Sequence, residues 1–213
     1  MRNIRYMGKL DSFQSLERGE LPEGAIKFRE PGTMSRIILS ATLISLPIIL
    51  ISSVILFMKS AGRFYDLPVP IIVLNFLITF GLLFVHELIH ALSLPPEVGK
   101  EIWTKFSDGV LLIHFDRPIT RGQFIRLSLA PNVILGLIPF TLYAMGLFDR
   151  SQALSDSIGF ISWMMLLGGV GDYLNVFNAI RQVPPDAEVF NYGLHSYWIP
   201  SDPGERENRY VRG

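Results

Sequence analysis

The chain has 213 residues, no cysteine and a formal net charge of zero. The lack of cysteine excludes a disulfide framework and a thiolate metal site. The balanced charge gives no indication of a nucleic-acid partner. Only 18% of the residues are charged, which is low because about 25% is usual in a soluble domain.

Long apolar runs dominate the chain after a polar N-terminal segment. Because residues 1–36 are polar, the first apolar run is not a secretory signal peptide. Four runs then approach the ~20 residues that cross a bilayer, and they cover residues 37–58, 71–94, 127–148 and 158–180. We therefore predict a mainly α-helical, polytopic membrane protein with four transmembrane helices. A soluble all-α core is the alternative.

The basic residues are distributed unevenly about these four runs. With four spans, the N-terminus, the loop at 95–126 and the C-terminus share one side, and that side holds 16 of the 19 lysines and arginines. The other side holds Lys59, Arg63 and Arg150. The positive-inside rule then predicts a multi-pass protein of the cell membrane with both termini in the cytoplasm.

Short strand patterns lie in the predicted cytoplasmic segments. Residues 101–115 read as two strands around Ser-Asp-Gly, which predicts a hairpin. Short strands are also expected near 25–30, 187–192 and 196–200. The predicted organisation is a cytoplasmic N-terminal segment (1–36), a membrane domain (37–181) and a cytoplasmic C-terminal segment (182–213), with a small β-rich cytoplasmic cap.

The second apolar run contains the sequence HELIH, residues 86–90. On a helix, His86 and His90 lie on one face, where both rings can bind one Zn²⁺ ion. Zinc lowers the pKa of a bound water to roughly 7, and Glu87 can then act as the general base. Because ionisable residues within a membrane span usually mark function, we predict a catalytic zinc site. The alternative is a buried cluster that hydrogen-bonds neighbouring helices.

A catalytic zinc site usually has three protein ligands. Besides Glu87, the only acidic residue deep within a predicted span is Asp172. At 1.5 Å per residue it lies ~13 Å before the end of the fourth helix, similar to the ~12 Å for His86 in the second. Asp172 is therefore the predicted third ligand, and pairing with neighbouring Asn or Tyr is the alternative. Lesser candidates are His114, His195 and Glu188.

Polar and small residues near the same depth extend the predicted site. Asn132 follows Pro131 about 9 Å into the third run, where its amide could bind a substrate backbone or a developing oxyanion. A purely structural contact between helices is the alternative. The glycines before Asp172 would allow close contact between the second and fourth helices; they are Gly168, Gly169 and Gly171.

These motifs together resemble a family of bacterial and archaeal membrane proteins known as putative zincin peptidases. The resemblance rests on HELIH, Pro131-Asn132, Gly171-Asp172 and the stretch PPDAEVFNYG, and it covers about residues 70–200. The chain is more distantly similar to site-2 proteases, which are intramembrane zinc metalloproteases. The similarity to site-2 proteases implies His86, His90 and Asp172 as ligands and Glu87 as the base. The resemblance to the bacterial and archaeal family implies a prokaryotic source. Site-2 proteases usually have Leu-Asp-Gly where this chain has VGDYLN.

The predicted function is hydrolysis of peptide bonds in membrane-associated substrates near the cytoplasmic face of the bilayer. One alternative is a non-catalytic scaffold or chaperone that uses the His/Glu/Asp cluster structurally. Another is an ion or proton relay, which four spans without a repeat make less favourable. The substitution Glu87→Gln distinguishes these functions. In a protease it should abolish activity and spare zinc binding, in a scaffold it should matter little, and in a proton relay it should alter the flux and its pH dependence.

Overall fold

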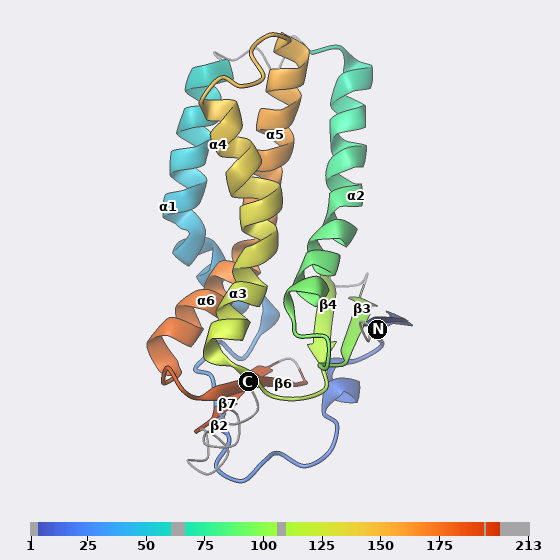
Figure 1. The fold of residues 1–213 in the computed structure, drawn as a ribbon, viewed down its shortest axis with the longest axis vertical. Coiled ribbons are helices and arrows are strands. Elements are labelled where there is room, and N and C mark those ends of the chain that lie inside the picture. Colours follow the sequence, from blue (N-terminus) through green and yellow to red (C-terminus); the bar gives the residue numbers. More distant parts are fainter. Residues whose placement is uncertain (1–3, 61–66, 106–109, 194, 201–213) are drawn as a thin grey trace. The chain divides into compact units, whose positions relative to one another are not determined.

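A computed structural model of the chain describes residues 4–60, 67–105, 110–193 and 195–200 (Figure 1). The chain forms two compact units. The helical unit comprises residues 31–90 and 128–175, and the β unit comprises residues 1–30, 91–127 and 176–213. The predicted Ser-Asp-Gly turn lies outside the described residues, as do residues 61–66 of the connection between the first two predicted spans. The three-part domain division made from the sequence stays a prediction.

The first two predicted spans are continuous helices. Helix α1 covers Met34–Ser60 and α2 covers Val69–Ser93, close to the predicted bounds. Buried serines of α1 use their hydroxyls within the helix: Ser45 Oγ donates to the Ala41 carbonyl at 2.7 Å, and Ser52 Oγ donates to the Ile48 carbonyl at 2.7 Å. In the helical unit, α1, α4 and α5 share an apolar core of Leu56, Phe140, Tyr143 and Leu166.

The third predicted span starts and ends earlier than the apolar run. Helix α3 (Arg121–Pro131) continues through a π-helical segment (Asn132–Leu137) into α4 (Ile138–Ala144). Thr120 and Gln123 form a capping box at its start: Gln123 N donates to Thr120 Oγ1, and Thr120 N donates to Gln123 Oε1. Gly146, with φ of 83°, provides the left-handed residue that ends α4.

The fourth predicted span is not the single straight helix that the run at 158–180 suggested. The structure has α5 (Gln152–Gly168) and α6 (Val170–Gln182), which meet at a 47° bend. Within the described residues, three helices are long and apolar enough to cross a membrane, and the bent pair makes a fourth if it counts as one span. The mainly helical fold is confirmed, while the membrane assignment rests on length and composition.

The β unit contains the predicted short strands. In the described part of the chain, β1 (Ile4–Lys9), β3 (Lys100–Lys105) and β4 (Val110–Phe115) form one sheet in that spatial order: β1–β3 parallel, β3–β4 antiparallel. The β3–β4 pair is the predicted hairpin. Strand β1 was not predicted, because its partner is about 96 residues away in the chain and no local pattern marks it.

A second sheet has the order β2-β7-β6-β5, with every neighbouring pair antiparallel. Its strands are β2 (Ile26–Lys27), β5 (Ile119–Thr120), β6 (Glu188–Tyr192) and β7 (His195–Ile199). The buried core of this unit is apolar and includes Phe28, Phe124 and Val189. The rings of Phe28 and Phe124 meet edge to face, with centroids 6.1 Å apart.

Candidate metal centre

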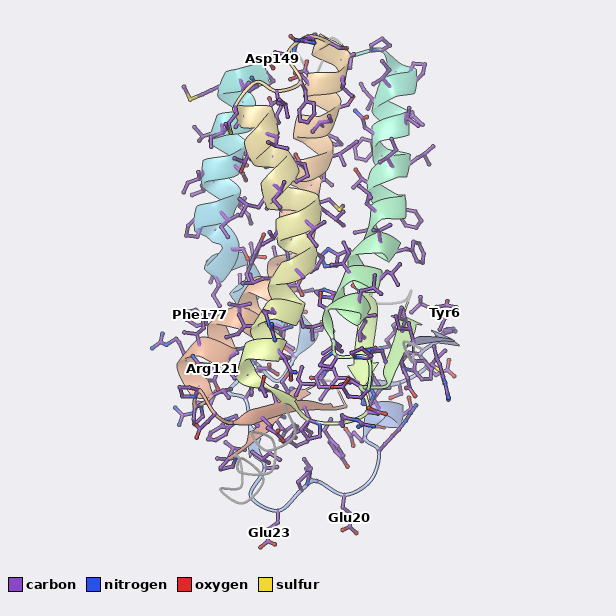
Figure 2. All side chains as sticks on the ribbon, viewed as in Figure 1. Tyr6, Glu20, Glu23, Arg121, Asp149 and Phe177 are labelled. Atoms are coloured by element: carbon purple, nitrogen blue, oxygen red, sulfur yellow. The ribbon has the colours of Figure 1, made fainter. Side chains whose placement is uncertain are left out.

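Helix α2 reverses the usual pattern of a soluble helix. From Val69 to His90, its fully buried residues are all polar: Asn75, Thr79, His86 and His90. Its exposed face is apolar, with Leu77 at 63% and Phe80 at 61% exposure, and Figure 2 shows side chains extending outward along the length of α2. An α-helix satisfies its own backbone hydrogen bonds, so a helix with an apolar exposed face is suited to contact lipid. The buried polar face of α2 contains the two histidines of the predicted metal site.

His86, His90 and Asp172 form one compact group in the helical unit. Their potential ligand atoms all lie within 4.8 Å of one another. His86 Nε2 is 3.1 Å from Asp172 Oδ2, and His90 Nε2 is 3.3 Å from Asp172 Oδ1. The helical spacing of four residues brings the two rings to a centroid separation of 4.8 Å.

The nitrogen and oxygen donors of this group match what zinc binds in proteins. Two neutral imidazoles and one carboxylate provide three ligands and leave a position for water, as in catalytic zinc sites. The side chains are only 9%, 10% and 13% exposed, so an ion there would be shielded from bulk water. The structure therefore brings together the three residues that the sequence predicted as ligands, and their role as ligands stays a prediction.

Glu87 lies beside this group on α2. Its carboxylate directly follows His86 in the sequence and interacts electrostatically with His90 and Asp172. None of the contacts described above uses Glu87 as a metal ligand. This arrangement is compatible with the predicted role of a general base.

Asn132 contacts this group directly through its side-chain amide. Its side-chain Nδ2 donates to Asp172 Oδ2 at 2.7 Å and to the Ser128 carbonyl at 3.2 Å. The residue is 2% exposed. The sequence placed Asn132 at the depth of the histidines and offered two roles for it. One was to bind a substrate backbone or an oxyanion, and the other was a structural contact between helices.

The glycines before Asp172 have different neighbours. A Cβ atom added to Gly168 would lie 3.9 Å from Leu83 of α2, in line with the predicted contact between these helices. Gly169 instead faces Asn132, whose amide a Cβ atom would overlap. Gly171 has nothing within 4 Å of that position among the described residues.

The other candidate ligands belong to the β unit and do not join the group. His114 on β4 pairs across the hairpin with Glu101 on β3, and its Nδ1 lies 4.0 Å from Glu101 Oε2. Burial lowers the pKa of His114, and the charge of Glu101 opposes this. His195 Nδ1 lies 3.3 Å from Glu30 Oε2, and Glu188 pairs with Thr120 in the sheet. Among the described residues, only His86, His90 and Asp172 form a possible metal group.

Comparison with known proteins agrees with the chemistry of this group. A family model described as "Putative zincin peptidase" matches residues 79–187, which include all the residues of the metal group. Neither the curated proteins nor the solved structures contain a significant match. The more distant similarity to site-2 proteases stays a prediction. Because the matched segment covers half of the chain, the protein belongs to the putative zincin peptidase family.

Proposed function

We propose that the protein is an integral-membrane zinc metalloprotease that cleaves peptide bonds of membrane proteins or membrane-associated peptides. The observation that carries this proposal is the His86/His90/Asp172 group on helices whose outer faces are apolar. Family membership supports a zinc peptidase. The excess of basic residues around the proposed cytoplasmic segments supports a cell-membrane location with both termini inside and the site near the cytoplasmic face.

His86, His90 and Asp172 would hold the zinc ion. When bound, zinc supplies Lewis-acid chemistry: it makes water more acidic and polarises a carbonyl group. The Glu87 carboxylate accepts a proton from the attacking water as the new C–O bond forms. It then returns this proton to the leaving amine nitrogen as the C–N bond breaks. The low exposure of the group limits competing reactions with bulk water.

The test compares wild type with Glu87→Gln, expressed in cells and as purified protein. The wild type should generate new protein N-termini in the membrane fraction, and Glu87→Gln should reduce their formation by about 10²- to 10⁴-fold. Zinc content should be unchanged, since Glu87 is not a ligand. Glu23→Gln removes an exposed carboxyl group of the β unit and is the matched control.

Three results would contradict parts of this proposal. Equal cleavage by wild type and Glu87→Gln would exclude Glu87 as the base. Zinc binding without any cleavage would favour a membrane scaffold. A pH-dependent ion flux lost in Glu87→Gln would instead identify a relay.

A further inference from the structure

We propose that Asn132 is a positioning residue for the metal ligand Asp172, and that Gly169 is glycine because the Asn132 amide occupies the space of a side chain there. The inference rests on the proposed zinc site and adds two residues to it. It also replaces the substrate-binding role that the sequence suggested for Asn132.

The donors of Asn132 are already in use. A side-chain amide has two N–H donors on one nitrogen. Here Nδ2 has two acceptors, the Asp172 carboxylate at 2.7 Å and the Ser128 carbonyl at 3.2 Å. Donation to an oxyanion would require one of these buried bonds to break. The bond to Asp172 involves a carboxylate, so it is charge-assisted and among the stronger hydrogen bonds.

The contact fixes one particular oxygen of Asp172. Oδ2 accepts from Asn132 and lies 3.1 Å from His86 Nε2, while Oδ1 lies 3.3 Å from His90 Nε2. Rotation of the carboxylate would therefore break the bond to Asn132. Partners of this kind orient metal ligands, and their loss typically weakens metal affinity about 10- to 100-fold.

Gly169 makes room for this amide. Its backbone, with φ of −83° and ψ of 14°, is available to any residue, so conformational freedom does not explain the glycine. Space does, because a Cβ atom would overlap Asn132. The amide oxygen Oδ1 of Asn132 is buried and has no hydrogen-bond partner in the described part of the chain. It packs against Gly169 at the bend between α5 and α6, and Asp172 lies three residues further along the chain.

The two residues should therefore act as a unit, which a double-mutant cycle can test on the full chain purified in detergent. The variants are Asn132→Ala, Gly169→Ala and the double substitution, with Gly171→Ala as the control. The measurements are zinc affinity by chelator competition and the visible absorption spectrum of bound Co²⁺, which reports ligand geometry.

Asn132→Ala and Gly169→Ala should each weaken zinc binding about 10- to 100-fold and alter the cobalt spectrum. The double variant should bind no more weakly than Asn132→Ala, because without the amide an alanine at 169 meets no obstacle. Gly171→Ala should match wild type. If Gly169→Ala does not fold, recovery of folding in the double variant supports the proposed steric conflict between a side chain at position 169 and the Asn132 amide.

Wild-type affinity and an unchanged spectrum in Asn132→Ala would overturn the positioning role. Additive losses in the double variant would overturn the steric unit. Failure of the proposed zinc site looks different, since wild type itself would then bind neither zinc nor cobalt. Failure of the protease function alone would leave zinc binding intact and abolish only cleavage. The unfolding temperatures of the same four variants would still test the steric unit, with additive decreases again contradicting it.

Discussion

The core of the β unit and helix α2 of the helical unit bury opposite kinds of residue. In the β unit, the buried core is built from apolar side chains such as Phe28, Phe124 and Val189. In the helical unit, α2 exposes leucine and phenylalanine and buries asparagine, threonine and two histidines. The first pattern follows from the hydrophobic effect in water. The second is what lipid allows, and it leaves the buried face of α2 for polar chemistry.

The largest expected effect is a loss of stability when the apolar core of the β unit loses a large side chain. Phe28 is 2% exposed and packs edge-on against Phe124. Phe28→Ala should lower the free energy of unfolding by about 3–5 kcal/mol, since it removes buried area and leaves a cavity. Denaturation in detergent would measure this. A change below about 1 kcal/mol would show that this core is not packed as described.

A charge on the exposed apolar face of α2 tests whether that face contacts lipid. Leu77→Lys places an ammonium group at a 63%-exposed position of a proposed span. It should cost about 2.5–3.5 kcal/mol in lipid, visible as a lower yield of folded protein in the membrane fraction. Tyr6→Lys, at a 64%-exposed position of β1, should stay within about 0.5 kcal/mol of wild type. Equal tolerance of both would argue that α2 faces water.

A buried acid makes the β unit sensitive to pH. Burial raises the pKa of Glu30 from 4.5 to about 7, although the backbone N–H of Ser196 and the charge of Lys27 oppose it. Because the folded state favours the protonated form, this contribution is complete below pH 4.5 and is lost as the pH rises through about 7.

The loss should reach up to about 3 kcal/mol at high pH. Glu30→Gln carries no titratable group, so the unfolding temperature of wild type relative to this variant should fall between pH 5 and pH 8. A constant difference across that range would contradict the shifted pKa.

The smallest effect is expected at an ion pair of the helical unit. Lys59 Nζ lies 2.8 Å from Asp149 Oδ2, and Asp149 is 54% exposed at the connection between α4 and α5 (Figure 2). Asp149→Asn should cost no more than about 1 kcal/mol, and the difference should shrink in high salt. A loss of several kcal/mol would mean that this connection is buried in the native protein.

The sequence alone identified what local patterns determine. Hydropathy located the helices, alternating strand-forming residues located the β3–β4 hairpin, and the HELIH spacing located two metal-group residues. Asp172 was found by matching its depth to that of His86, and the structure brings the two to 3.1 Å. Each of these predictions depends on residues close in sequence or on the constant rise per residue of a helix.

The remaining features depend on contacts between distant residues. The parallel pairing of β1 with β3 has no local signal. The capping box at Thr120 lies in a polar stretch, so hydropathy placed the start of the third helix too late. The bend at Gly169 and the hydrogen bond from Asn132 to Asp172 are linked by packing between helices. A glycine in the sequence does not reveal which neighbour requires it.

The central claim is that His86, His90 and Asp172 bind one zinc ion. The most direct measurement is the metal content of detergent-purified protein by mass spectrometry, for wild type, His86→Ala and Asp172→Ala. We expect about one zinc per chain in the wild type and its loss from both folded variants, since two ligands rarely retain the ion. Absence of stoichiometric metal from folded, metal-replete wild type, or full retention by both variants, would contradict the account.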